Sequence, residues 1–121
     1  MQFNISEVKM NLSIKHNESY IDPVKIVLKD DVIVGCVFPI CNALVYTSGN
    51  NLNTINDFFK DNDQALIYTI KTINRYRKAF GYDALYIDKL SNGIANIRGD
   101  SFWKSQGFVQ DANPCLMYLN D

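Results

Sequence analysis

The chain has few cysteines, a single histidine and no long hydrophobic run. Its three cysteines, Cys36, Cys41 and Cys115, show no C-x-x-C spacing, which argues against a disulfide framework and favours free thiols in a reducing compartment. With His16 as the only histidine, we expect no metal centre. No window approaches the roughly 18 apolar residues of a membrane span, and the first residues lack the pattern of a signal peptide. These absences predict a cytoplasmic protein without a membrane partner.

The chain also lacks an excess of either charge. Twelve basic and 13 acidic side chains leave a net charge of −1 over 121 residues, which argues against nucleic acid as a partner. The length predicts a single domain over 1–121, with an ambiguous segment at 1–22 and a core at 24–121. Fourteen asparagines and 13 isoleucines are typical of an AT-rich genome, such as that of a low-GC bacterium or a phage.

Hydrophobic runs in the first half predict short strands. The β-branched runs at 25–29 and 32–38 are separated by Asp30-Asp31, which predicts a hairpin turn, and Pro39 is expected to end the second strand. The runs at 43–47 and 52–59 predict a third and a fourth strand, with turn residues between them. Residues 1–20 fit either a strand or a short helix.

The hydrophobic period changes after residue 60. From Asp63 to Phe80, apolar side chains recur every three to four residues, which predicts an amphipathic helix of about five turns, ended by Gly81. Its later basic residues complement the helix dipole, and we interpret them as a solvated face. They are Lys71, Arg75, Arg77 and Lys78.

The last third predicts a strand, a short helix and a hairpin. The expected ranges are 84–87 for the strand, 100–106 for the helix, and 107–110 and 115–119 for the hairpin, with a turn around Asn113-Pro114. The expected order of elements indicates an α+β or α/β domain with a mixed central sheet. This order is antiparallel strands, a long helix, a strand, a short helix and a hairpin.

The stretch NIRGDSFWKSQGF resembles the late motif N-x-x-A-x-x-L-Y-x-K-x-G-F of the GCN5-related N-acetyltransferases, the GNAT family. Asn96, Phe102, Gly107 and Phe108 fall on pattern positions, and Lys104 lies one place from its own. The resemblance covers 24–121. It implies a GNAT-like fold in which the long amphipathic helix follows the fourth strand and the short helix precedes the C-terminal hairpin. The chain is also similar to short GNAT-like internal virion proteins of podophages, which would place it in a virion.

The resemblance implies acetyl-CoA as the cofactor, held by a loop Q/R-x-x-G-x-G/A at the start of the long helix. Lys60, Asp63 and Ala65 fall on the first, fourth and sixth positions of this loop, so an aspartate replaces the central glycine. Its carboxylate would repel a pyrophosphate, and by itself Asp63 is typical of a helix N-cap. Phe58 and Phe59 precede the loop, where they could border a pocket.

Two residues of the late motif complete the candidate site. Asn96 falls on the family residue that contacts the CoA arm, although a loop asparagine is also a common turn former. Trp103 replaces the tyrosine that serves the family as a general acid. Because an indole does not release its proton at neutral pH, we expect Trp103 to be a packing anchor.

Two functions follow from these residues. The first is a GNAT-like protein with a degraded acetyl-CoA loop, non-catalytic or weakly active, that acts by binding a protein partner. The second is an active acetyl-CoA-dependent N-acetyltransferase acting on an amine of a small molecule or protein. In that case backbone amides of 52–59 would polarise the thioester carbonyl, and Asp57 is a candidate base. A splayed strand pair facing a cleft would favour the enzyme, and a groove filled by side chains would favour the interaction protein.

Overall fold

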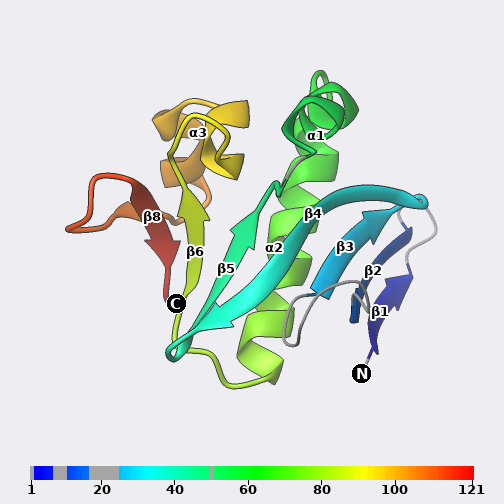
Figure 1. Cartoon of the computed structure of the whole chain (residues 1–121), viewed down its shortest axis with the longest axis horizontal. Helices are drawn as coiled ribbons and strands as arrows, with labels where there is room; N and C mark the ends of the chain where they lie inside the picture. Colours follow the sequence, from blue (N-terminus) through cyan, green and yellow to red (C-terminus); the bar gives the residue numbers. More distant parts are fainter. Residues whose placement is uncertain (1, 7–10, 17–24, 50) are drawn as a thin grey trace.

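The chain forms one mixed sheet with a long helix along one of its faces (Figure 1). The computed structural model describes residues 2–6, 11–16, 25–49 and 51–121. Within them the sheet has eight strands in the order β1-β2-β3-β4-β5-β6-β8-β7. The strands are β1 (Gln2–Ser6), β2 (Asn11–His16), β3 (Lys25–Lys29), β4 (Val32–Ile40), β5 (Ala43–Thr47), β6 (Leu85–Asp88), β7 (Val109–Gln110) and β8 (Leu116–Leu119). The predicted α+β class with a mixed sheet is confirmed.

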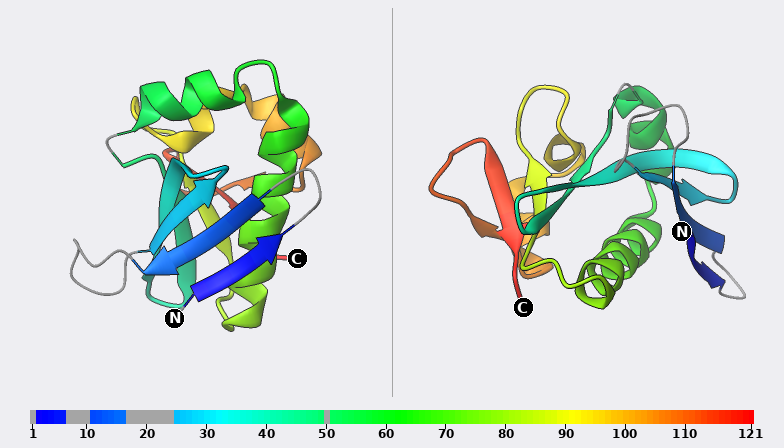
Figure 2. Two further views of the ribbon diagram at one scale, coloured as in Figure 1. Left: turned by 90° about the vertical axis from the view of Figure 1, so that its right-hand side faces the viewer. Right: turned by 60° about the horizontal axis from the view of Figure 1, so that its bottom comes forward.

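Helices connect the strands at the centre of the sheet. They are α1 (Leu52–Phe59), α2 (Asp63–Ala79), the short 3₁₀ helix η1 (Ile94–Ile97) and α3 (Asp100–Ser105). β5 and β6 pair in parallel, and the chain between them passes through α1 and α2. Figures 1 and 2 show α2 running along one face of the sheet, while no described helix covers the opposite face of β5 and β6.

Side chains of β5 and β6 alternate between a buried and an open face. Leu44, Tyr46, Leu85 and Ile87 are buried in one core with apolar residues of α2. The intervening side chains are only half-buried, because they point to the face that no described helix covers. This open face carries a hollow that is described below.

The predicted hairpin turn at Asp30-Asp31 is confirmed, because both residues have positive φ angles, 51° and 65°, between β3 and β4. The prediction that Pro39 ends its strand is wrong, since β4 continues to Ile40 and Pro39 pairs with Leu44. The Leu44 N–H donates to the carbonyl of Ala84, on the side away from β4. Pro39 and Leu44 therefore form a non-hydrogen-bonded pair, where a proline costs no ladder bond.

The prediction of a strand at 52–59 is also wrong, because these residues form helix α1. Its buried residues Ile55 and Phe59 lie four apart, and half-buried Leu52 lies one turn earlier, which is a helical rather than an alternating period. Five described strands and α1 therefore precede α2, so the long helix does not follow a fourth strand. The part of 1–20 that is described consists of strands β1 and β2.

The predicted helix from Asp63 to Phe80 is confirmed as α2, and Gly81 follows it with a φ of 80°. The expected solvated basic face holds only in part, since Arg77 is buried. Its guanidinium donates to the Asn74 side chain and to the backbone carbonyls of Asp83 and Asp121. Burial lowers the pKa of Arg77, while Asp121 and Asp83 act in the opposite direction. Arg77 therefore joins α2 to the segments before β6 and after β8.

A β-bulge shapes the middle of β4. Val27 pairs with Gly35 and Leu28 with Ile33, so Val34 is an extra residue in β4. The Tyr46 hydroxyl donates to the carbonyl of Val34, and Gly35 adopts a φ of 136° beside it. Because a Cβ on Gly35 would lie 2.4 Å from Cε1 of Tyr46, only glycine leaves room for this ring.

Two buried tyrosines predict a loss of stability at alkaline pH. Burial raises the pKa of Tyr46, with a smaller contribution from Cys36, and burial raises the pKa of Tyr76 to about 12, with a contribution from Tyr82. The ordinary pKa is about 10. The stabilisation by the neutral phenols is therefore complete below about pH 10 and is lost as the pH rises through the folded-state values.

We expect the urea midpoint to fall between about pH 9 and about pH 11.5, and to fall less in Tyr76→Phe. An equal fall in the wild type and in the variant would contradict this assignment for Tyr76.

Candidate functional site

The start of α2 differs from a pyrophosphate-binding helix start. Asn62, not Asp63, is the N-cap, and its side chain accepts a hydrogen bond of 3.1 Å from the Ala65 N–H. The interpretation of Asp63 as N-cap is wrong, because the residue before it already provides the cap. Asp63 instead pairs with Arg98, whose Nε donates to its carboxylate at 2.9 Å.

Arg98 joins three segments around the start of α2. Besides Asp63, its guanidinium donates to the carbonyl of Ile97 at 2.8 Å and to that of Phe59 at the end of α1. Its Cζ lies 5.7 Å from the centre of the Phe102 ring. The Arg98 side chain is 15% exposed and that of Asp63 is 62% exposed. The sequence analysis did not single out Arg98, although it lies inside the motif that carried the family resemblance.

The other predicted loop residues are mostly turned inward. Phe59 and Ala65 are buried in the core, and Phe58 is half-buried, with its ring edge-on to Phe59 at 5.1 Å. The Nζ of Lys29 lies 5.6 Å from the centre of the Phe58 ring. Neither phenylalanine lines the hollows described below, and of the five residues predicted at this loop only Lys60 and Asp63 are exposed.

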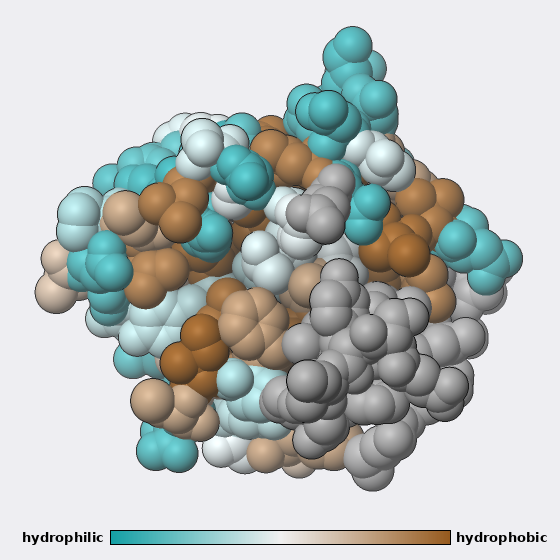
Figure 3. All heavy atoms as spheres, viewed as in Figure 1, coloured by the Kyte–Doolittle hydropathy of each residue, from teal (hydrophilic) through white to brown (hydrophobic). Residues whose placement is uncertain are grey.

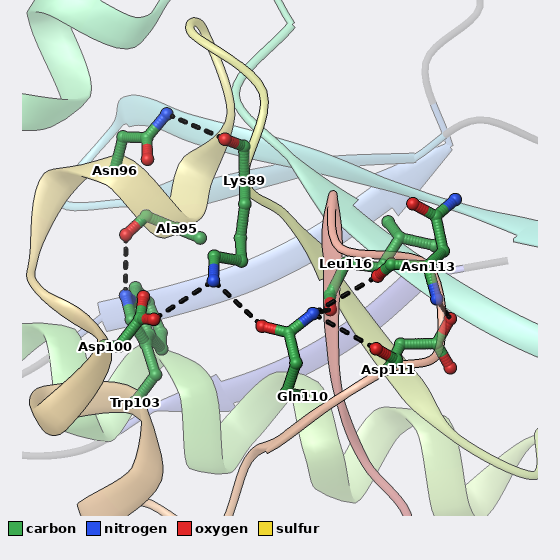
Figure 4. Close-up of polar contacts among 9 residues, drawn as sticks. All are labelled: Lys89, Ala95, Asn96, Asp100, Trp103, Gln110, Asp111, Asn113 and Leu116. Atoms are coloured by element: carbon green, nitrogen blue, oxygen red, sulfur yellow. Dashed lines mark hydrogen bonds and ion pairs between the residues drawn. The ribbon is translucent and has the colours of Figure 1, made fainter.

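The residues of the late motif make contacts that hold the fold together. Trp103 is fully buried, and its Nε1 donates to the carbonyl of Ala95 at 2.7 Å (Figure 4). Its ring packs edge-on against Phe102 and Phe108. Asn96 donates from its side chain to the carbonyls of Lys89 and Leu90. Trp103 thus has the contacts of a packing anchor, and Asn96 holds the loop after β6.

The carboxyl ends of β5 and β6 are bridged by the loop after β6. The hydroxyl of buried Ser48 donates to the carbonyl of Asn92 at 2.6 Å. The Leu90 N–H donates to the Asp88 carboxylate at 2.6 Å, and a Cβ on Gly93 would collide with the Asp88 carbonyl. Shallow hollows of ≈ 320 and ≈ 370 Å³ flank this bridge. The loop after β6 is therefore bonded to the residue that follows β5.

These contacts test whether acetyl-CoA would fit at the expected loop. A carboxylate already lies at the helix start, held by Arg98, and one of the first N–H groups of α2 is bound by Asn62. A second anion at this helix start would meet the Asp63 charge. The residues at the expected loop are therefore a poor fit for the pyrophosphate of the cofactor.

A hollow lies on the open face of the sheet, and we call it the front groove. Its volume is ≈ 530 Å³, and it includes none of the predicted site residues. Figure 3 views this face and shows apolar side chains gathered over β4, β5 and β6. The lining residues are Phe38, Ile40, Cys41, Ala43, Val45, Thr47, Tyr86, Asp88, Leu90, Asp111, Asn113, Cys115 and Leu116.

The sequence analysis missed the front groove. The sequence signal for the groove is the alternation of residues along β5 and β6. This alternation identifies the groove only when it is known which face of the sheet the helix covers.

Two searches of the described residues give negative results. They contain no group of three or more His, Cys, Asp or Glu side chains placed to hold a metal ion. None of their helices is long and apolar enough to cross a membrane.

Comparison of the chain with protein-family models, with curated proteins and with solved structures finds no match.

Proposed function

We propose that this chain is a GNAT-like protein that does not use acetyl-CoA and acts by binding another protein. The observation that carries the proposal is the Asp63–Arg98 pair at the start of α2. An internal carboxylate lies where the resemblance would place the pyrophosphate, and Arg98 is paired with it. The partial positive charge of the helix start already interacts with this carboxylate, so a second anion gains less from binding there.

Two features support the GNAT-like part of the proposal. Parallel β5 and β6 are joined through a long helix, and a short helix precedes the C-terminal hairpin, as the resemblance implies. The motif residues Asn96, Trp103 and Phe108 also lie together around the end of β6 and α3. The many asparagines and isoleucines are typical of an AT-rich genome, which supports a phage or low-GC bacterial origin. A virion or cytoplasmic role for the protein would follow from that origin.

The alternative, an active N-acetyltransferase, has less support. Its expected backbone amides at 52–59 belong to helix α1 and not to a strand, those from Ile55 onward bond within the helix, and Asp57 is exposed on that helix. The ends of β5 and β6, where a splayed strand pair would receive the thioester, are joined by the Ser48–Asn92 hydrogen bond. Trp103 is buried, and its Nε1 donates to the carbonyl of Ala95.

Calorimetric titration with acetyl-CoA tests the proposal. We expect no binding by the unaltered protein at concentrations up to about 1 mM, because two like charges near each other cost on the order of 1–3 kcal/mol before screening. Asp63→Asn removes the carboxylate and frees Arg98, so any residual affinity for inorganic pyrophosphate should rise in that variant.

Asp61→Asn is the matched control, because it removes an exposed neighbouring carboxylate that lies outside the Arg98 pair. Micromolar binding of acetyl-CoA by the unaltered protein would contradict the proposal and direct attention to amine acceptors.

A further inference from the structure

The front groove combines an apolar floor with an acidic rim. Two of its residues, Ile40 and Leu90, are more than half exposed although both are large and apolar. Phe38, Val45 and Leu116 are half-buried beside them. Exposed apolar surface of this kind marks interaction sites, and a hollow of this volume is large enough for a bulky side chain.

The charges that face the groove have one sign. Among its described lining residues, Asp88 and Asp111 are acidic and none is Lys, Arg or His. Lys89 follows Asp88 but does not line the groove. Its Nζ donates to Asp100 at 3.0 Å and to Gln110 at 2.8 Å, so both carboxylates at the rim are left without this cation (Figure 4).

The wall beside Asp111 is held in place before any partner binds. The Gln110 amide donates to the carbonyls of Leu116, Asp111 and Asn113, as Figure 4 shows in part. The Asn113 N–H donates to the Asp111 carboxylate, and the Cys115 N–H donates to the Asn113 side chain. A turn fixed by this many bonds loses little entropy on binding.

We propose that the front groove binds a segment of a partner protein in which a large apolar side chain lies next to a lysine or arginine. The apolar side chain occupies the floor between β4, β5 and β8, and the cation faces Asp88 and Asp111. This inference rests on the proposed function, because it names the partner surface of a protein that acts by interaction. Charge complementarity selects the segment, since an acidic one would meet two carboxylates.

The test is an NMR titration of the ¹⁵N-labelled full chain with two peptides whose termini are blocked and therefore uncharged. The first is acetyl-Gly-Arg-Phe-Arg-Gly-amide, and the second has glutamate in place of both arginines. We expect the first to bind with a Kd of about 0.1–1 mM and to shift the amide signals of Val45, Tyr86 and Leu116, with the second at least about tenfold weaker.

Two double variants separate the charge from the fold. Asp88→Asn with Asp111→Asn keeps oxygen acceptors for the Leu90 and Asn113 N–H groups and should abolish the preference for the arginine peptide. Asp31→Asn with Asp57→Asn removes two exposed carboxylates outside the groove and should leave the preference unchanged. Equal affinity for both peptides, or shifts confined to other surfaces, would overturn the proposal.

Analytical sedimentation of the free protein tests whether a second copy of the chain occupies the front groove instead. A dimer that Val45→Arg dissociates would show that a second copy fills the groove, which also overturns the proposal. An acetyl-CoA titration of the same sample reports on the proposed function separately. If neither the peptides nor acetyl-CoA bind, only the proposal for the front groove is rejected. If acetyl-CoA binds, the proposed function is rejected.

Discussion

Replacing Trp103 by alanine is expected to lower the free energy of unfolding by about 3–5 kcal/mol. The side chain is fully buried, contacts two aromatic rings and donates a hydrogen bond to the Ala95 carbonyl. Its removal leaves a cavity and an unpaired carbonyl in the core. Because a domain of this size has about 5–15 kcal/mol of stability, this change removes a large part of the total.

Urea denaturation followed by circular dichroism measures the effect, since Trp103 is the only tryptophan and its fluorescence is lost with it. Trp103→Phe keeps a ring but removes the donor, so we expect a loss of about 1–3 kcal/mol. Leu90→Ala is the control, because that side chain is 55% exposed and should change stability by less than about 1 kcal/mol. A loss below about 1 kcal/mol for Trp103→Ala would show that the residue is not a packing anchor.

Gly35→Ala is expected to cost about 3 kcal/mol or more. A Cβ at this position would lie 2.4 Å from Cε1 of Tyr46 and 2.8 Å from the carbonyl oxygen of Thr47, so either the ring or the backbone of β5 must move. The φ of 136° adds backbone strain for any other residue. Moving Tyr46 would also weaken its bond to the Val34 carbonyl, which holds the bulge of β4.

The measurement is the urea midpoint of Gly35→Ala against Gly99→Ala. A Cβ on Gly99 meets nothing within 4 Å, and its φ is −74°, so the second change should cost less than about 1 kcal/mol. Equal midpoints for the two variants would mean that the bulge tolerates a side chain, and that its glycine does not determine the shape of β4.

Local pattern predicted most of the secondary structure but not all of it. The period of α2, the Asp30-Asp31 turn and the last hairpin depend on neighbouring residues, and each is confirmed. Helix α1 was missed because its paired phenylalanines and short apolar run also fit a strand, and only burial of Ile55 and Phe59 together distinguishes the two. Pro39 was misjudged because its position in the ladder depends on how β4 and β5 pair.

The candidate site was less predictable than the fold. Asp63 is bonded to a residue 35 positions away, and Ser48 to one 44 positions away, so no spacing rule links them. The seven residues predicted for the site lie in several places: Phe59, Ala65 and Trp103 in the core, Phe58 half-buried against it, Lys60 exposed, Asn96 bonded to the loop after β6, and Asp63 in an ion pair. The front groove draws its lining from β4, β5, β6 and the β7–β8 turn, which are distant along the chain.

By itself, the sequence determined the balanced charge, the long amphipathic helix with its glycine stop, the order of the elements in the second half and the aspartate at the start of α2. These depend on residue type and on contacts a few positions apart, which a linear pattern records. Only the tertiary structure decided which carboxylate is paired, which strand ends are bonded to each other and which sheet face stays open. Those features arise when the parallel pairing of β5 and β6 brings distant segments together, and pairing of that kind leaves no local signal.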